Sequence, residues 1–327
     1  MAELMVDTGA VLQNYRHFAA DGEVIPVLKA NGCGLGLGPM QALLRSWGVR
    51  RFACSTPEEA LYLSRDGDSE VLLLSCIHNP ETLLPLVRQG VTLAIESLEQ
   101  VEQIDALGIP ARVHLAVDTG FGRFGFPCGE TDQMKRAFFL PNVRVCGIYS
   151  HFRSEKSAPA QFAAFNQVLE ALRDYDVGLR HIAATQTALD PRYRLDAVRI
   201  GTGLTGRCPG LQPAARLTAR ICSMRHLPRG TRIGYGDIRL RRDTDVAILE
   251  VGTSDGAFLR RYSGFRSFLR SLHRYVYLCG GEARVLGCPG LTHTEVDVTG
   301  LRCQIGDHVV VDQSPVLVSP AVPRRYL

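Results

Sequence analysis

The chain has 327 residues, 46% of them hydrophobic and 21% charged, which suits one large or two ordinary globular domains. Its formal charge is +4 and its Lys and Arg residues are scattered along the chain, which argues against a dedicated nucleic-acid-binding protein. No apolar stretch approaches the length of a membrane span, and the N-terminus lacks a signal-peptide pattern, so we expect a cytoplasmic protein.

The ten cysteines indicate neither a disulfide scaffold nor a metal centre. None forms a CxxC pair, and no pair lies near two histidines at the spacing of a zinc site. In a cytoplasm they are expected to be reduced thiols. The sequence therefore predicts no metal site.

In the first two thirds of the chain, short apolar segments alternate with longer amphipathic ones. The predicted strands are residues 23–28, 51–54, 70–75, 91–95, 111–117, 143–149, 179–184 and 197–200. The predicted helices between them are residues 57–65, 79–89, 98–107, 134–139 and 157–175. Strands that are each followed by a helix-length connection predict a parallel sheet wrapped by helices. Eight strands close a (β/α)8 TIM-type barrel, and an open doubly wound sheet is the alternative.

After about residue 210 the pattern changes to strand-like segments separated by turns. These predicted strands are residues 217–224, 245–251, 283–286, 295–298 and 308–311, with one helix expected around 263–274. Such a pattern is typical of a mainly antiparallel β domain. We therefore predict a barrel over residues 8–210 and a C-terminal β domain over 211–327, which the N-terminal strand at residues 3–7 could join.

The first predicted barrel strand ends at Lys29. In a barrel, strand ends and the loops after them build the active site. A partly desolvated lysine there has a lowered pKa and is a candidate for Schiff-base formation, although a solvated lysine before a flexible loop is the plainer interpretation. The glycines that follow fit neither a phosphate-binding Walker motif nor the GxGxxG of dinucleotide-binding proteins.

Polar residues also stand at the ends of four other predicted strands: Arg123, His151, Thr185 and Arg199. One such residue is routinely structural, but five at different strand ends suit an anionic ligand held beside an amine. The loops after strands seven and eight are the usual phosphate site of a barrel, and here they contain Thr185, Gly201 and Thr202.

These segments resemble the alanine racemase family of fold-type III pyridoxal-phosphate enzymes. Residues 27–36 (VLKANGCGLG) are similar to the family's VVKANAYGHG, and residues 116–126 to its KVDTGMGRLGF. Residues 150–152 resemble THF, and residues 197–206 resemble MVRPGIALYG. Residues 233–236, 252–256 and 322–324 are similar to VSYG, GYADG and VPR. The motifs occur in the family's order over essentially the whole chain.

The resemblance implies a racemase or epimerase that uses pyridoxal 5'-phosphate to act on an amino acid, a small-molecule partner. Lys29 would hold the cofactor and accept a proton, and Tyr235 would be the acid/base on the opposite face of the substrate's α-carbon. Because Tyr235 comes from the β domain of a partner in this family, the resemblance also implies a head-to-tail homodimer with shared active sites. It implies no nucleic-acid or membrane partner.

The resemblance assigns the remaining contacts as well. Arg199 would meet the pyridine nitrogen, and because arginine keeps its proton that nitrogen would stay unprotonated. Arg123 would meet the cofactor's phenolic oxygen and the substrate carboxylate, and Leu291 would lie near that carboxylate. His151 would support Arg199 and Tyr235. The phosphate would be held by Thr185, Gly201 and Thr202.

Several positions depart from the family pattern. Cys33 stands where the family has a tyrosine beside the phosphate, and Thr253 replaces the tyrosine of GYADG. The family's SMD element is replaced by residues 290–292 (GLT), and no tyrosine occurs between Tyr277 and Tyr326 to act as its gate. Ala116 stands for a lysine that is sometimes carbamylated. We therefore expect a substrate larger than alanine.

Two alternative functions remain open at the level of sequence. One is a different reaction on the same cofactor, such as decarboxylation or aldol cleavage of an amino acid. The other is a catalytically weak homologue that binds pyridoxal phosphate without efficient turnover.

Overall fold

The computed structural model describes residues 1–259 and 274–327, which form two compact units. The first, here called the barrel unit, consists of Ala10–Cys33 and Leu37–Gln212. The second, the β unit, takes in Met1–Gly9, Gly34–Gly36 and the described part of Pro213–Leu327. The helix expected around residues 263–274 falls almost wholly outside the described residues.

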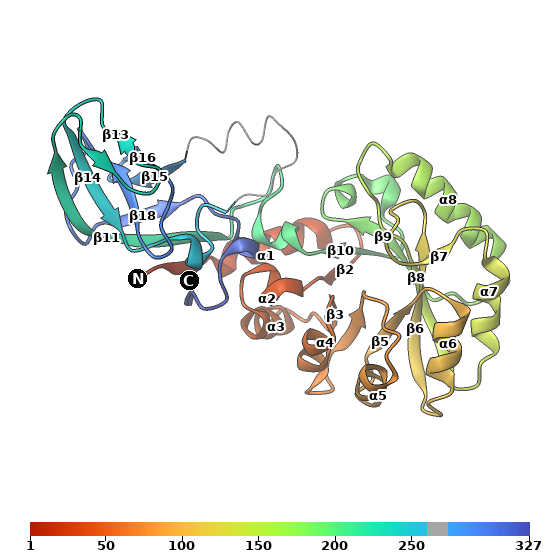
Figure 1. Ribbon diagram of the computed structural model, residues 1–327. Coiled ribbons are helices and arrows are strands. Elements are labelled where there is room, and N and C mark those ends of the chain that lie inside the picture. The colour runs from red at the N-terminus through yellow and green to blue at the C-terminus, as the bar shows by residue number, and fades with distance from the viewer. Residues whose placement is uncertain (260–273) are drawn as a thin grey trace. The chain divides into compact units, whose positions relative to one another are not determined.

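Eight parallel strands form the sheet of the barrel unit, in the order β2-β10-β9-β8-β6-β5-β4-β3 (Figure 1). They are β2 (Glu23–Pro26), β3 (Arg51–Cys54), β4 (Glu70–Leu73), β5 (Thr92–Ile95), β6 (Ala111–Asp118), β8 (Val143–Tyr149), β9 (Leu179–Ala184) and β10 (Ala197–Ile200). The ring closes between β2 and β3, where Val27 bridges Ala53 and the Leu28 N–H donates to the Ala53 carbonyl at 2.8 Å. The predicted barrel is confirmed, and the open doubly wound sheet is wrong.

The barrel strands are short apolar runs because both of their faces are covered. All four residues of β5 and of β10 are buried, the pattern expected of a parallel sheet enclosed by helices. Inside the ring, one apolar cluster contains Ile25, Val27 and Leu72. A short strand, β7 (Phe126–Pro127), pairs with the end of β6 outside the main ring.

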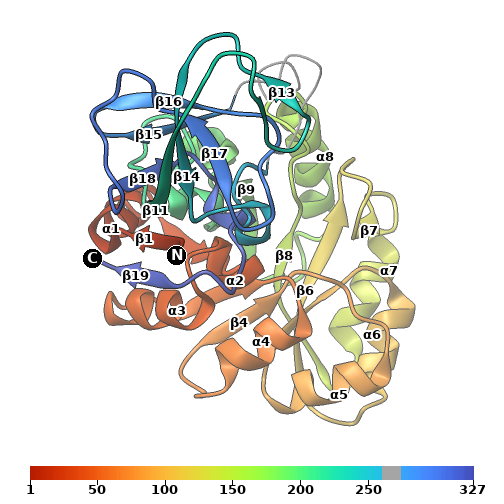
Figure 2. The same cartoon turned by 60° about the vertical axis from the view of Figure 1, so that its left-hand side comes forward.

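Helices follow most barrel strands and lie outside them (Figures 1 and 2). They are α3 (Leu37–Ser46), α4 (Pro57–Ser64), α5 (Pro80–Arg88), α6 (Leu98–Asp105), α7 (Thr131–Arg136) and α8 (Ala158–Ala171). Side chains in the sequence mark three of their starts. Thr56 and Glu59 form a capping box on α4, Asn79 caps α5 and Ser97 caps α6.

The helix expectations need two corrections. Helices α1 (Thr8–Ala19) and α3 were not predicted from the sequence. The segment expected at 134–139 is the end of α7 followed by the 3-10 turn η1 (Ala137–Phe139). Between β9 and β10 the connection holds only the 3-10 turns η2 (Thr187–Leu189) and η3 (Pro191–Tyr193), where Pro191 starts the second turn.

The β unit contains an eight-stranded sheet in the order β14-β17-β16-β15-β18-β11-β1-β19 (Figure 2). Its strands are β1 (Glu3–Val6), β11 (Ala215–Leu227), β14 (Thr244–Leu249), β15 (Tyr275–Leu278), β16 (Gly281–Val285), β17 (Thr294–Asp297), β18 (His308–Val311) and β19 (Arg324–Tyr326). All pairings are antiparallel except β1 with β19, which confirms the mainly antiparallel prediction. The sequence analysis did not anticipate β15 and β19.

The long strand β11 organises this sheet. It pairs with β1 and β18 along its first half and with β14 along its second, with a register shift between Ile221 and Ser223. A separate ribbon, β12 (Arg232–Ile233) and β13 (Ile238–Arg239), carries Tyr235 in its turn. None of the helices in residues 1–259 and 274–327 has both the length and the apolar character of a bilayer-spanning helix.

Candidate active site

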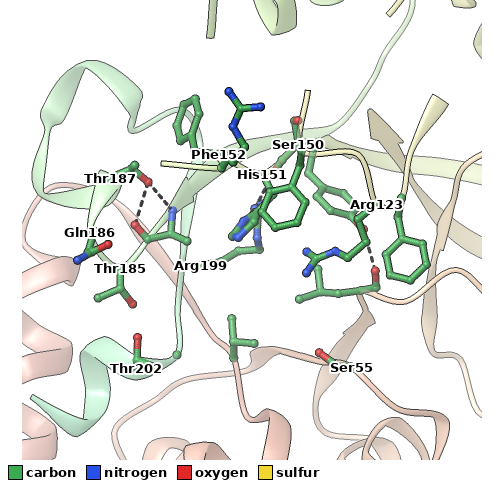
Figure 3. A pocket seen from close by; sticks show the side chains of 18 of the residues that line it. Ser55, Arg123, Ser150, His151, Phe152, Thr185, Gln186, Thr187, Arg199 and Thr202 are labelled. Carbon is green, nitrogen blue, oxygen red and sulfur yellow. Dashed lines mark hydrogen bonds between the residues drawn. The ribbon is translucent and has the colours of Figure 1, made fainter. Parts of the chain in front are cut away.

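A cavity of about 660 Å³ lies at the ends of the barrel strands, lined by residues that follow β2, β3, β4, β6, β8, β9 and β10. Its lining includes every site residue predicted in this unit: Lys29, Arg123, His151, Thr185, Arg199, Gly201 and Thr202. Figure 3 shows Thr185 and Thr202 on one side of the cavity, Arg123 on the other, and Arg199 and His151 between them. The parallel strands bring these residues together because their carboxyl ends meet at one face of the barrel.

Lys29 is followed by a left-handed turn. Ala30, Asn31, Gly32 and Cys33 have φ values of 50°, 58°, 65° and 55°. This conformation costs a non-glycine residue about 1–2 kcal/mol, so Ala30, Asn31 and Cys33 need support from their surroundings. The Leu37 N–H donates to the Asn31 side chain at 2.9 Å, and the Cys33 thiol donates to the Val27 carbonyl at 3.2 Å.

Strained backbone of this kind is typical of functional sites. The turn sets the direction in which Lys29 leaves the barrel strand. Lys29 itself is exposed, so the partial desolvation expected for its amine is not seen.

Arg199 is buried at 3% exposure in the floor of the cavity. Its guanidinium donates to the carbonyls of Ser150 at 2.6 Å, Ile182 at 3.1 Å and His181 at 3.2 Å. It also donates to the ring nitrogens Nδ1 of His181 and, at 3.3 Å, of His151. Burial, together with the nearby charge of Arg123, lowers the pKa of Arg199 to about 10, so Arg199 remains a cation at neutral pH.

Two histidines inside the barrel extend this network. Because His181 accepts from Arg199 at Nδ1, its Nε2 carries the proton and donates to His114 Nδ1 at 3.0 Å. Burial and the charges of Arg51, Arg112 and Arg199 lower the pKa of His114 to about 3. Burial and Arg199 also hold the pKa of His181 well below its usual range. Both imidazoles are therefore neutral at pH 7.

An aromatic side chain, that of Tyr149, lies beside Arg199 and His181. The ring of Tyr149 stacks on His181, with ring centroids 5.2 Å apart and an interplanar angle of 3°. The Arg199 guanidinium lies 5.1 Å from the centroid of the same ring, and the Tyr149 hydroxyl donates to the Leu74 carbonyl at 3.1 Å. His114, Tyr149 and His181 were not among the predicted site residues, although polar residues inside predicted buried strands were an available signal.

His151 is held as a neutral acceptor beside Arg199. Burial and the charges of Arg199, Arg123 and Lys29 lower the pKa of His151 to about 3. The side chain of Gln161 donates to the His151 carbonyl at 3.2 Å and so fixes the loop after β8.

The loops after β9 and β10 form a small polar cradle. Thr202 begins the 3-10 turn η4 (Thr202–Thr205), whose first N–H groups have no partner within the turn. The Gly203 N–H donates to the Thr185 hydroxyl at 3.1 Å, and a Cβ on Gly203 would lie 2.8 Å from Ile200 Cγ2. Backbone N–H groups and two hydroxyls at the end of a turn suit an anion such as a phosphate.

Tyr235 and Leu291 belong to the β unit. Tyr235 is 72% exposed between two glycines of positive φ, and the Cys288 N–H donates to its carbonyl at 2.9 Å. Leu291 is 73% exposed, and its carbonyl accepts from the Ser254 N–H at 2.9 Å. The Thr253 N–H donates to the Gly290 carbonyl at 2.9 Å. These bonds join residues 235 and 253–254 to the segment 288–291 in one loop cluster.

Across residues 1–259 and 274–327 no group of three or more His, Cys, Asp and Glu side chains is arranged to hold a metal ion. Besides Glu155 and Gln186, the polar side chains that line the cavity are cations, the imidazole of His151 and hydroxyls, a set that suits an organic anion.

Comparisons with known proteins match both units. The model of the family described as "Alanine racemase, N-terminal domain" matches residues 6–209, and that of "Alanine racemase, C-terminal domain" matches residues 214–318. The alanine racemase of Desulforamulus reducens is 32% identical over 314 residues, covering 88% of this chain and 82% of the relative. That of Methanococcus maripaludis is 28% identical over 335 residues, covering 94% and 87%.

Solved structures agree with the fold. The alanine racemase of Clostridium difficile 630 superposes with a TM-score of 0.89 at 21% identity, covering all of this chain and 95% of the other. The biosynthetic alanine racemase of Pseudomonas aeruginosa superposes with a TM-score of 0.86 at 26% identity, covering all of this chain and 99% of the other. The chain belongs to the alanine racemase family of pyridoxal 5'-phosphate-dependent racemases.

Proposed function

We propose that this racemase inverts its amino acid with two acid/base groups, Lys29 and Tyr235, around a cofactor held in the barrel cavity. The observation that carries the proposal is the placing of Lys29 in one cavity with a buried cation, Arg199, whose contacts are carbonyls and neutral imidazoles. Such a cation is suited to a ligand with a lone pair or a negative charge.

The cavity residues fit pyridoxal phosphate. Thr185, Gly201 and Thr202 would hold the phosphate at the polar cradle, and Lys29 would bind the aldehyde carbon covalently. Bound pyridoxal phosphate supplies an electron-withdrawing ring that acidifies the α-hydrogen of an attached amino acid.

Arg199 would meet the ring nitrogen. Since the guanidinium stays protonated, it would donate to that nitrogen without transferring a proton. Arg199 would thereby leave the ring nitrogen uncharged and limit how much negative charge the ring could store, which would favour a simple proton exchange at Cα.

Inversion needs an acid/base group on each face of the α-carbon. Lys29 Nζ would accept or donate the proton on one face, and Tyr235 Oη on the other. We propose a head-to-tail homodimer in which Tyr235 of the partner subunit supplies the second group. The exposure of Tyr235 at the tip of a ribbon, 72%, is in keeping with a side chain that functions at an interface.

We further propose that the substrate is bulkier than alanine, with Leu291 near its carboxylate. Thr253 stands where the family pattern has a tyrosine, and its hydroxyl is already within 3.3 Å of the Gly290 carbonyl as a donor. The matched relatives are named alanine racemases, so alanine is the reference substrate. Emptied pocket volume destabilises a protein by roughly 24 cal/mol per Å³, so a larger side chain is the natural occupant.

The test is to incubate single enantiomers of alanine, serine, leucine, lysine and arginine with the holoenzyme in deuterated water. The proposal expects the opposite enantiomer to accumulate with deuterium at Cα, and expects kcat/KM to be highest for a substrate other than alanine. Release of carbon dioxide or an aldehyde would instead identify a decarboxylase or aldolase. Bound cofactor without exchange would identify a weak homologue, and a maximum at alanine would exclude the enlarged pocket.

A further inference from the structure

The guanidinium of Arg123 lies between two phenylalanine rings at the edge of the cavity. Its Cζ is 4.4 Å from the ring centroid of Phe121 and 5.7 Å from that of Phe124. Within the part of the chain that the structure describes, this guanidinium makes no ion pair and no hydrogen bond with protein. Aromatic faces, not a carboxylate, are therefore its neighbours.

Nearby carboxylates are engaged with backbone. Asp118 accepts from the N–H groups of Gly120 and Phe121 at 2.8 Å and of Gly122 at 3.1 Å, and these bonds lower the pKa of the Asp118 carboxyl against the opposing effect of its burial. At the other end of the loop, Glu96 accepts from the Gly125 N–H at 3.1 Å. The two carboxylates fix the course of the loop and leave the direction of the Arg123 side chain to the rings.

Gly125 shows how tightly the loop is held. A Cβ at Gly125 would lie 2.5 Å from the Asp118 N, and its φ of 124° is itself unfavourable for other residues. The loop therefore closes back on its own starting strand. This gives the three residues Phe121, Arg123 and Phe124 a defined frame.

Phe121 also contacts the residue beside Arg199. Its ring centroid is 5.3 Å from that of His151, with the planes tilted by 53°, and His151 accepts from Arg199. The Phe121 ring thus contacts both the exposed cation Arg123 and the imidazole of His151.

We propose that Phe121 and Phe124 form an aromatic clamp that positions Arg123 to bind the carboxylate of the substrate. The inference rests on the proposed function, in which Arg123 meets that carboxylate. A carboxylate partner from the protein would occupy in-plane N–H groups and neutralise the charge, whereas a ring attracts the cation through its face. The guanidinium keeps its edge donors for a bidentate contact with a carboxylate. Phe121 and Phe124 are positioning residues.

The first experiment measures acetate, a minimal carboxylate, binding to the holoenzyme by the change in cofactor absorbance. Phe121→Leu should raise the Kd for acetate and the KM for the amino acid about two- to fivefold, with kcat nearly unchanged. Phe124→Leu should have a smaller effect, since its ring is farther from Arg123. Phe139→Leu is the matched control, because Phe139 is 74% exposed in η1 and does not line the cavity.

The second experiment separates a cation–π contact from simple packing. Phe121 is replaced by phenylalanines carrying one, two or three ring fluorines, which withdraw charge from the ring face with little change in volume. The clamp predicts a stepwise rise of the acetate Kd with fluorine number, and rescue towards the wild-type value in Phe121→Trp. A flat fluorine series, or acetate binding in Phe121→Leu equal to that in Phe139→Leu, would overturn the proposal.

The acetate titration does not require turnover. If the fluorine series behaves as expected but no amino acid is racemised, the clamp stands and the proposed function fails. If racemisation proceeds but the acetate Kd does not change with fluorine number, the proposed function stands and the clamp fails.

Discussion

At the scale of single residues, the network Arg199–His181–His114 places one permanent cation next to neutral imidazoles. Each hydrogen bond has a defined direction, since a guanidinium can only donate and His181, which accepts at Nδ1, donates to His114 through Nε2. Protonating either histidine would put a second positive charge against Arg199 in a buried place. Burial, together with this repulsion, is why the pKa values of His114 and His181 are lowered.

This network predicts how stability depends on pH. His114 has a folded-state pKa of about 3, against about 6.5 when unfolded, so between those values the unfolded chain binds the additional proton. The free energy of unfolding should therefore fall on acidification, by about 1 kcal/mol for each such histidine between pH 6.5 and 5.5. Urea titrations at several pH values measure this slope.

Two histidine variants test whether the buried histidines cause this pH dependence. His114→Gln should lower overall stability but reduce the slope. His226, whose pKa is raised by its hydrogen bond to Asp245, has the opposite sign, because its contribution is present at low pH and lost on alkalisation. His226→Gln should therefore leave the acid-side fall at least as steep. An unchanged slope in His114→Gln would contradict the assignment of neutral, buried histidines.

At the scale of elements, the left-handed turn after β2 and the loop after β6 orient the side chains of Lys29 and Arg123. Both are held by side chains from their own segment: Asn31 bonds to the start of α3, and Asp118 to the N–H groups of its loop. Short polar side chains are common in such places because they satisfy backbone donors that lack a helix or sheet partner. In this way Asn31 helps to set the direction of Lys29, and Asp118 helps to set that of Arg123.

Asn31 offers a test of the strained turn. Asn31→Ala removes the bond to the Leu37 N–H and leaves a residue poorly suited to a φ of 58°, so it should destabilise the protein by about 2 kcal/mol. Asn31→Gly loses the same bond but adopts positive φ freely, and should be destabilised by about 1 kcal/mol. Denaturant unfolding of both variants measures the difference, and equal losses would show that backbone strain is unimportant there.

At the scale of the whole molecule, the proposed catalytic pair is divided between two units. Lys29 lies in the barrel unit and Tyr235 in the β unit, and each is exposed in its own unit. A dimer of shared sites would make activity a property of the pair of chains rather than of one chain. This distinguishes it from a racemase whose site is complete within a single subunit.

Complementation tests this arrangement. Lys29→Ala and Tyr235→Phe should each lack efficient racemisation on their own. When the two variants are co-expressed and mix at random, half of the dimers are heterodimers, and each contains one site with both Lys29 and Tyr235 of the partner subunit. Activity should then recover to about a quarter of wild type. Recovery should be lost on dilution below the dimer's dissociation constant, and no recovery in the mixture would contradict shared sites.

The sequence by itself determined the barrel, the β-rich second part and seven of the residues that line the cavity. Buried parallel strands are continuous apolar runs, so eight of them could be recognised, and residues at their carboxyl ends must meet at one face. Lys29, Arg123, His151, Thr185 and Arg199 could therefore be grouped by their positions at predicted strand ends. The helices α1 and α3 and the strands β15 and β19 could not be recognised, because their patterns are short or mixed.

Only the tertiary structure decided which residues support those side chains. His114 and His181 are 67 positions apart in the sequence. Their rings meet because both side chains point from their strands, β6 and β9, into the barrel interior. The rings of Phe121 and Phe124 flank Arg123 because Asp118 and Glu96 bend the loop between them. Periodicity reports whether a position is buried, whereas contacts between distant segments depend on register and loop geometry. For that reason the site residues at the strand ends could be predicted from the sequence, and the groups that support Arg199 and Arg123 could not.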